Sequence, residues 1–190
     1  TEEVDFFIAL AHDVAMALRN AFLFEDLQDE IDHNRNLFLG TTMALSAAID
    51  AKDHYTQGHT SRVTDLSIAI GRKLWYEKNQ KFDEKFFENL HVASLLHDIG
   101  KIGVPESILN KKGSLTEEER TVINGHCMIG VNILEPIKDL EPVIQGVKYH
   151  HERFDGKGYP DGLAADQIPL IAAIIAVADS IVADAQRYIL

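Results

Sequence analysis

The sequence has little of what builds disulfide-bonded, membrane-spanning or polynucleotide-binding proteins. It holds one cysteine, Cys127, so an intramolecular disulfide is excluded. No 18 consecutive apolar residues occur and no signal peptide is visible, so we expect a cytoplasmic protein without membrane insertion. The formal net charge of −12 is a poor match for binding a nucleic acid polymer, which depends on basic surface to release counterions.

What the sequence does contain is an apolar content typical of a packed helical domain. Hydrophobic residues make up 46% of the 190, enough to bury a substantial core. Their spacing follows the helical period, with few strand-like alternations, which predicts an all-α fold. We expect a long helical arm over residues 1–47 and one domain over residues 48–190. Because the chain begins with Thr1 and not with Met, we also expect it to be part of a longer protein.

Residues 4–49 are predicted to form one nearly continuous helix. No proline interrupts this segment, and only Gly40 weakens it. A helix this long cannot fold back on a small domain along its whole length, so its apolar stripe needs a partner. We expect a parallel homodimeric coiled coil. The alternative is packing of the helix on its own domain.

The rest of the chain is predicted to divide into short helices. His59 lies near the start of one, and Asp83 opens another. Thr116 and Glu119 form a capping box, which places His126 near the middle of the helix that follows. The first turns of two further helices are suited to two prolines, Pro142 and Pro169.

Six potential metal ligands lie in otherwise apolar segments. They are His97, Asp98, His126, His150, His151 and Asp179. A single histidine on an apolar helix face is typical of a satisfied core residue, but polar groups recurring on three inward faces predict one shared site, because burial without a partner is costly. Imidazole and carboxylate without thiolate suit iron, manganese, zinc or nickel. Adjacent helical residues point about 100° apart, so a pair such as His97-Asp98 can serve two neighbouring ions, with the carboxylate bridging them.

Two segments carry a family resemblance. The first is His97-Asp98-Ile99-Gly100-Lys101-Ile102-Gly103-Val104-Pro105, and the second is His150-His151-Glu152-Arg153-Phe154-Asp155-Gly156-Lys157-Gly158-Tyr159-Pro160. Both resemble the HD-GYP family, a bacterial branch of the HD superfamily of metal-dependent phosphohydrolases. The resemblance extends from about Ala48 to Ala178. It implies an all-α HD-domain helical bundle that hydrolyses cyclic di-GMP with two or three metal ions.

The first part of the predicted arm carries a second resemblance. Leu10 to Ala21 resembles the closing helix of GAF sensory domains, and Phe24-Glu25-Asp26-Leu27 resembles the signalling helix that usually follows them. This resemblance implies a missing N-terminal sensory domain, with the helix carrying its signal.

The HD-GYP resemblance also implies roles for individual residues. Asp98 would be catalytic through the metal ions, which convert a water into the attacking hydroxide. Lys101 would hold a phosphate oxygen, the alternative being an ordinary surface lysine. Gly158, Tyr159 and Pro160 would lie at the mouth of the site, where the tyrosine ring stacks on or bounds the guanine.

Two departures from the family pattern concern the third metal ion and the nucleotide. Three-metal members carry a Glu four residues before the position of His59, where this chain has Tyr55. A neutral phenol is a poor substitute for a carboxylate, so we expect two divalent ions, with His59 a weak ligand at most. Near the end, Val182 stands where the family has an acidic residue, and Arg187, the expected substrate contact, lacks its following proline. The C-terminal part of the nucleotide site is therefore expected to be truncated or altered.

The sequence leaves three functions open. The leading one is a phosphodiesterase that converts cyclic di-GMP to linear pGpG, and further to GMP only slowly. The second is a non-catalytic dinucleotide sensor or protein-interaction scaffold, which the altered C-terminus and the long arm favour. The presence of Lys101 and of the six potential ligands argues against it. The third, another HD-type nucleotide phosphohydrolase, is disfavoured by the Asp155-Gly156-Lys157-Gly158-Tyr159-Pro160 loop.

Overall fold

The computed structural model describes residues 1–53, 58–78 and 82–187, and it contains α-helices joined by loops and short 3-10 helices. Within these ranges the extended pairing is limited to an isolated antiparallel bridge between Asp155 and Ala164. The predicted all-α fold is therefore confirmed. The contacts divide the chain into two units, Thr1–Thr41 and Thr42–Leu190. The expected division after residue 47 stays a prediction.

The first unit consists of helix alone. Helix α1 (Glu2–Lys52) is 51 residues long, which confirms the continuous helix predicted for residues 4–49. Large apolar side chains along it are exposed, among them Phe7 at 65% and Leu27 at 57%. By length and composition, α1 is apolar enough to cross a membrane, with an 18-residue window of mean hydropathy 1.4. Signal sequences and core helices of soluble proteins have the same property, so the absence of membrane insertion stays a prediction.

The second unit is a bundle of short helices to which the last part of α1 contributes Thr42, Ser46 and Ile49. Along the chain it contains α2 (His59–Lys78), α3 (Glu84–Leu96), η1 (Ile99–Gly103), α4 (Glu106–Leu109), α5 (Glu117–Asn124), α6 (His126–Leu134), α7 (Glu141–Tyr149), η2 (Ala165–Gln167) and α8 (Leu170–Arg187).

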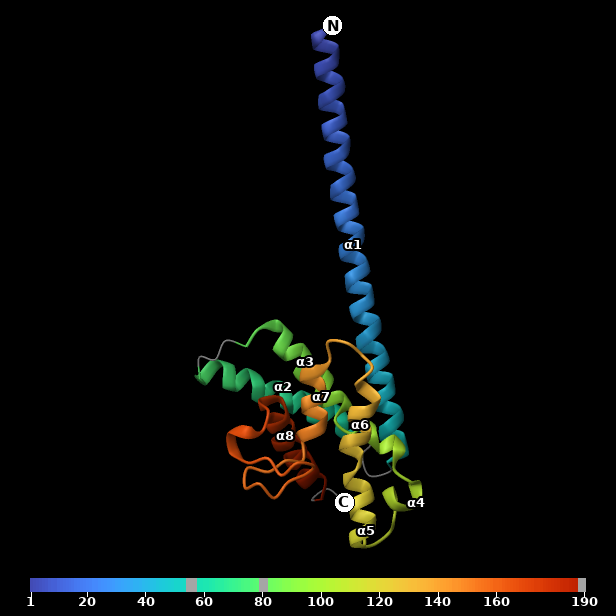
Figure 1. The fold of residues 1–190 in the computed structure, drawn as a ribbon, viewed down its shortest axis with the longest axis vertical. Helices are drawn as coiled ribbons and strands as arrows, with labels where there is room; N and C mark the ends of the chain where they lie inside the picture. The colour runs from blue at the N-terminus through green and yellow to red at the C-terminus, as the bar shows by residue number, and fades with distance from the viewer. Residues whose placement is uncertain (54–57, 79–81, 188–190) are drawn as a thin grey trace. The chain divides into compact units, whose positions relative to one another are not determined.

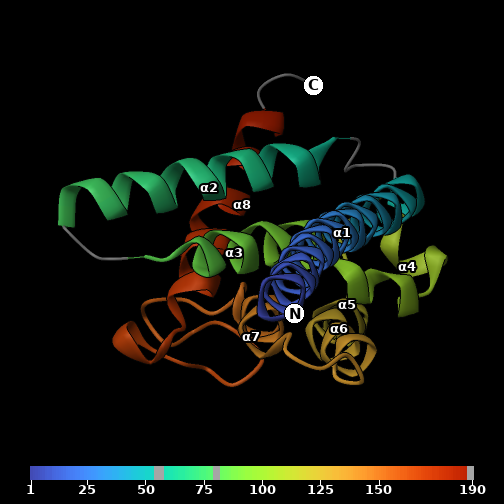
Figure 2. The same ribbon diagram turned by 90° about the horizontal axis from the view of Figure 1, so that it is seen from above.

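Helix α3 occupies the middle of this bundle (Figures 1 and 2). It packs against α2, α7 and α8, while α6 packs against α7 and η1. The side chains that fill the core are fully buried on these facing helices, for example Val63, Leu90, Val147 and Ile175. Burying such an aliphatic side chain contributes about 1.5–3 kcal/mol, so the bundle provides a stable frame for the polar groups within it.

Most of the predicted helix starts are confirmed. Helix α2 begins at His59, and the Asp83 carboxylate accepts a hydrogen bond from the Phe86 amide at the start of α3. The capping box of Thr116 and Glu119 is present at α5, and a proline occupies the first turn of α7.

One predicted helix is wrong in its extent. The segment predicted to carry His126 near its middle breaks at Gly125, so α5 ends at Asn124 and His126 is the first residue of α6. The break coincides with a close approach of η1, because a Cβ on Gly100 would lie 1.8 Å from the carbonyl oxygen of His126. Such contact between main chains is not encoded in the helical period.

Candidate metal centre

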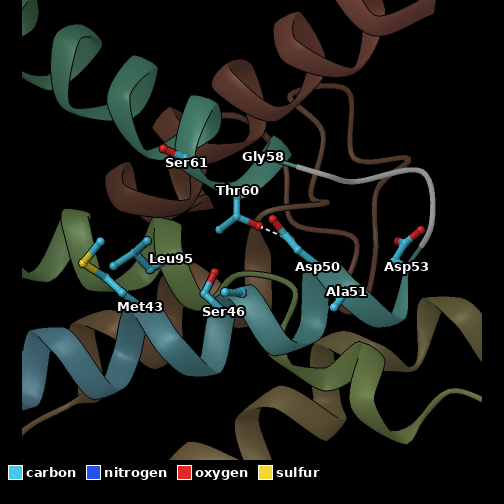
Figure 3. Close-up of a pocket in the computed structure, with 10 residues that line it drawn as sticks. Met43, Ser46, Asp50, Ala51, Asp53, Gly58, Thr60, Ser61 and Leu95 are labelled. Carbon is cyan, nitrogen blue, oxygen red and sulfur yellow. Dashed lines mark hydrogen bonds between the residues drawn. The ribbon is translucent and has the colours of Figure 1, made fainter.

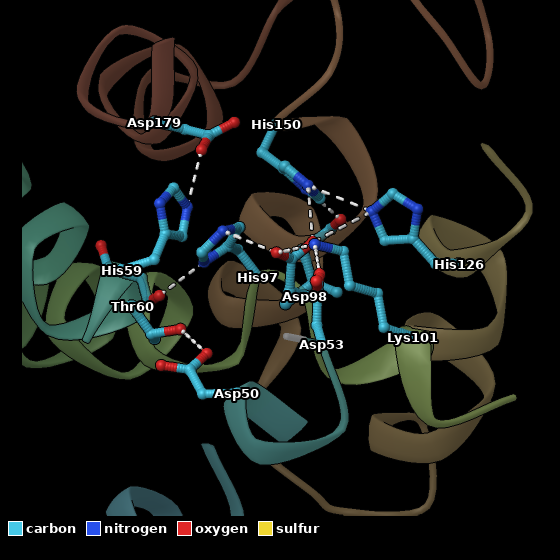
Figure 4. A network of polar contacts seen from close by, with 12 residues as sticks. Asp50, Asp53, His59, Thr60, His97, Asp98, Lys101, His126, His150 and Asp179 are labelled. Carbon is cyan, nitrogen blue, oxygen red and sulfur yellow. Dashed lines mark hydrogen bonds and ion pairs between the residues drawn. The ribbon is translucent and has the colours of Figure 1, made fainter. Parts of the chain in front are cut away.

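Most of the predicted ligands lie at helix ends that converge inside the bundle, and Asp179 lies in the middle of α8 (Figure 4). His97 ends α3, and Asp98 directly precedes η1. His126 begins α6. His150 ends α7, and His151 follows it in a turn. Side chains from separate helices are thereby brought together, as the shared apolar faces predicted.

The potential ligand atoms form two groups that share one carboxylate. Asp98, His126, His150 and His151 offer atoms within 4.8 Å of one another, and so do His59, His97 and Asp98. A carboxylate common to two groups has the position of a bridging ligand between two ions. The bridging of two ions by this carboxylate stays a prediction.

Asp179 contacts the second group through His59. The Nε2–H of His59 donates to Asp179 Oδ1 at 2.9 Å, and His59 is only 5% exposed. The sequence assigned His59 a weak role at most, whereas the structure buries it next to a predicted ligand. In this arrangement His59 orients the Asp179 carboxylate.

Main-chain carbonyls orient three of the histidine rings. The Nδ1–H groups donate to the carbonyl three residues earlier, from His97 to Ser94 at 2.8 Å, from His126 to Ile123 at 2.7 Å, and from His150 to Val147 at 2.8 Å. A carbonyl can only accept a hydrogen bond, so Nδ1 carries the hydrogen in each ring and a neutral ring has its lone pair on Nε2. Hydrogen bonds of this kind hold the imidazoles of metal sites in place.

These lone pairs converge on Asp98. His126 Nε2 lies 3.4 Å from His150 Nε2 and 3.4 Å from Asp98 Oδ1. His97 Nε2 is buried and lies 3.4 Å from Asp98 Oδ2. Facing lone pairs beside a carboxylate repel one another unless protons or a cation lie between them. The donor set therefore fits a divalent ion of the first transition row, which accepts imidazole nitrogen and carboxylate oxygen.

Burial and neighbouring charge separate the protonation of these groups. Burial lowers the pKa of His126 and of His150, and it lowers the pKa of His151 to about 4. Burial acts in the same direction on His97, but the charge of Asp98, a hydrogen bond to it, the charge of Asp179 and the hydrogen bond to Ser94 together outweigh burial and raise the His97 pKa to about 9. Three of the rings are thus neutral and ready to ligate at neutral pH, whereas His97 holds a proton.

Metal binding is expected to release that proton. Below about pH 9 a metal ion must displace it from His97 Nε2, so the apparent affinity should increase as the pH rises towards 9, by up to about tenfold per pH unit. Calorimetric titration with Mn²⁺ in buffers of different ionisation enthalpy should detect about one proton released at pH 7. An affinity independent of pH between 7 and 9 would contradict the assignment.

Lys101 is part of the centre and not a surface lysine. Its side chain is 16% exposed, and its Nζ lies 2.7 Å from Asp98 Oδ2 and 3.0 Å from Asp53 Oδ2. Burial opposes the charged form, but Asp98 and Asp53 outweigh it and raise the pKa of Lys101. The ammonium is therefore held in its charged form at the edge of the proposed metal sites.

Asp53 is a site residue that the sequence did not reveal. It is 6% exposed and directly follows α1, beyond the end predicted for the arm. No spacing relates it to Asp98 or Lys101, which follow much later in the chain, so only the tertiary structure brings the three together.

The Gly158-Tyr159-Pro160 segment packs onto the histidine pair. The Tyr159 ring lies 4.8 Å from the His151 ring, with an angle of 32° between their planes. A Cβ on Gly158 would meet the Arg153 nitrogen at 2.4 Å, so this loop needs a glycine there to reach the main chain beside the histidines. Tyr159 thus borders the proposed metal site, while its contact with guanine stays a prediction.

Glu152 orders the same loop. Its Oε1 accepts hydrogen bonds from the Asp161 and Gly162 amides. Cys127 is buried, and burial raises the pKa of its thiol to about 12, which agrees with a small core residue. Tyr55 and the side chain of Arg187 lie outside the described residues, so their predicted roles stay predictions.

A pocket of about 580 Å³ opens beside this centre (Figure 3). It is lined by the end of α1 and the start of α2, with Leu95 of α3. Asp50 and Thr60 join the two helices across it through a 2.6 Å hydrogen bond from the Thr60 hydroxyl to Asp50 Oδ1.

The HD domain family matches residues 43–189, which include every residue of the centre. The chain therefore belongs to this family. It is 38% identical to a cyclic di-GMP phosphodiesterase of Thermotoga maritima over 85% of this chain and 43% of that protein. It is 37% identical to a cyclic di-GMP phosphodiesterase of Pseudomonas aeruginosa, over 81% of this chain and 36% of that protein.

Other relatives are named for a different cyclic dinucleotide. A 3′3′-cGAMP-specific phosphodiesterase of Vibrio cholerae is 37% identical over 72% of this chain and 28% of that protein. A solved cyclic GMP-AMP-specific phosphodiesterase from V. cholerae has a similar fold, with a TM-score of 0.57 at 19% identity, covering 79% of this chain and 41% of that chain. The chain spans less than half the length of these relatives.

Proposed function

We propose that this chain is the catalytic part of a phosphodiesterase that hydrolyses cyclic di-GMP to linear pGpG. The observation that carries the proposal is Asp98, whose carboxylate is common to two groups of potential ligands and contacts Lys101. Bound divalent ions supply a hydroxide nucleophile at neutral pH and neutralise charge on the phosphodiester. The relatives named cyclic di-GMP phosphodiesterase support this substrate.

The protein's own residues would position the phosphodiester. Lys101 offers a compact cation that contacts two carboxylates. When a phosphate oxygen replaces one of these carboxylates, the other still holds the ammonium group in place. Two divalent ions against the Asp98 and Asp179 carboxylates leave a local excess of about two positive charges, which attracts an anionic dinucleotide to a chain of net charge −12.

We propose two ions per chain. Asp98, His126, His150 and His151 suit the first, and His97 and Asp98 suit the second, beside His59 and its partner Asp179. Tyr55 in the place of a carboxylate argues against a third. Elemental analysis of the loaded protein should give about two ions per chain. Three fully occupied positions in anomalous scattering, with His59 bound to one, would contradict this count.

The function is tested by incubating the Mn²⁺-loaded chain with cyclic di-GMP and resolving the products by chromatography. We expect pGpG to accumulate and GMP to appear slowly, as the resemblance to two-metal members implies. The same assay with 3′3′-cGAMP decides between the two substrates named for the relatives. Binding of cyclic di-GMP without hydrolysis would favour the non-catalytic sensor, and cleavage of nucleoside triphosphates alone would favour another HD-type phosphohydrolase.

We further propose that α1 dimerises the chain in the cytoplasm, downstream of a sensory domain. Large apolar side chains are exposed along most of the part of α1 that forms the first unit. This exposed apolar surface is larger than soluble monomers usually tolerate. Sedimentation of the purified chain without detergent should give a dimer. A helical monomer would contradict dimerisation, and recovery in the membrane fraction would instead indicate insertion of α1.

A further inference from the structure

The last turn of α1 contacts the metal centre from two directions. On one side, Asp50 accepts the hydrogen bond from Thr60, the residue that follows His59 (Figures 3 and 4). On the other side, Lys52 and Asp53 both contact η1, the short helix that follows Asp98. This turn therefore touches the surroundings of both ligand groups.

Lys52 binds the main chain of η1 with all three hydrogens of its ammonium group. Its Nζ donates to the carbonyl oxygens of Lys101 at 3.1 Å, Ile102 at 2.8 Å and Val104 at 2.7 Å. Carbonyls at the end of a helix lack partners within it, and a cation is favourable at that end. Lys52 thus satisfies the end of η1 from outside.

The two ends of Lys101 are held by consecutive residues. Lys52 binds the Lys101 carbonyl, while Asp53 accepts from the Lys101 ammonium at 3.0 Å. The main chain of Lys52 is itself fixed, because the Asn110 side-chain amide donates to its carbonyl at 2.9 Å. At Gly100, η1 closely approaches the His126 carbonyl, which fixes the position of this part of η1. Helix η1 therefore lies between two fixed points, one of which is the Lys52 ammonium.

We infer that Lys52 is a positioning residue for the hydrolysis proposed above, setting through η1 where Lys101 stands relative to the ligand groups. This inference rests on the proposed function for its effect on turnover. Without Lys52, three carbonyls lose a donor and η1 is held on one side only. A displacement of about 1 Å at a positioning group can cost about 100-fold in rate. The metal ligands themselves remain in place.

The test uses the full chain with three substitutions. Lys52→Met removes the ammonium at similar length, Lys52→Arg restores a cation with several donors, and Lys111→Met is the matched control. Lys111 is a partly buried lysine that donates to both oxygens of Glu119 and does not touch η1. Each protein is assayed for kcat and KM with cyclic di-GMP, for Mn²⁺ content, and for hydrogen exchange at the Val104 amide, which donates to the Lys101 carbonyl.

Lys52→Met is expected to lower kcat by at least about tenfold, with KM changed less than twofold and Mn²⁺ content unchanged. The Val104 amide should exchange at least about tenfold faster than in the wild type, Lys52→Arg should recover part of both losses, and Lys111→Met should show neither. If Lys52→Met does not fold, Lys52→Gln replaces it, with an expected loss of at least about threefold in kcat.

Unchanged kcat and unchanged Val104 exchange in the folded variant would overturn the inference, as would losses equal to those of Lys111→Met. A fall in turnover explained by lost Mn²⁺ would overturn it too. If the wild type does not hydrolyse the dinucleotide, the proposed function fails. The exchange rate at Val104 then still decides whether Lys52 positions η1.

Discussion

Asp98→Ala is expected to remove at least one metal ion and to lower turnover by at least about 1,000-fold. Loss of a partner outside the coordination sphere of a metal typically costs about 10–100-fold, and a carboxylate shared by two ions should cost more. Among the residues that the structure describes, Asp98 alone belongs to both groups of potential ligands. Its charge also raises the pKa of His97 against the effect of burial. Elemental analysis and the chromatographic assay measure the two effects.

The control for this substitution is Asp65→Ala, which removes an exposed carboxylate of α2 and should change neither metal content nor rate. Asp98→Asn keeps the size of the side chain and should still lower metal content, because the amide is a weak ligand without charge. Unchanged metal and activity in Asp98→Ala would show that the ligand assignment is wrong.

Lys101→Ala is expected to keep its metal ions and to lose about 30- to 900-fold in turnover. A protonated lysine cannot ligate a metal, so its loss should leave elemental content unchanged. One charged contact to a developing phosphate charge contributes about 2–4 kcal/mol to transition-state stabilisation, which corresponds to that range of rates. Single-turnover kinetics on the loaded variant would separate this loss from weaker binding of the dinucleotide.

The Asp53 carboxylate complicates this substitution, because Lys101 is its buried partner. Lys101→Ala should therefore also lower the thermal midpoint. The double variant with Asp53→Asn also removes the buried charge that Lys101 neutralised and should recover stability without recovering turnover. A normal rate in Lys101→Ala would leave Lys101 with a structural role only.

The helical period and the ligand types were enough to predict the long helix and the convergence of six side chains. These properties are local or follow from burial, since a polar residue within an apolar face must find a partner inside. Asp53 escaped prediction because its partner Lys101 is 48 residues later in the sequence and no pattern joins them. The break before His126 escaped it as well, since it depends on how closely η1 approaches the main chain of α6.

The orientation of His97, His126 and His150 has a consequence for how this domain tolerates change. Each ring is hydrogen-bonded to a carbonyl of its own chain segment, three residues earlier. No amino-acid replacement at Ser94, Ile123 or Val147 removes a carbonyl, so these three bonds survive sequence drift at the very positions that make them. The helical geometry of the main chain therefore sets the direction of the imidazole rings. An engineer could redesign the surrounding apolar side chains for stability, and the coordinating nitrogens would keep their direction as long as the three turns stay helical.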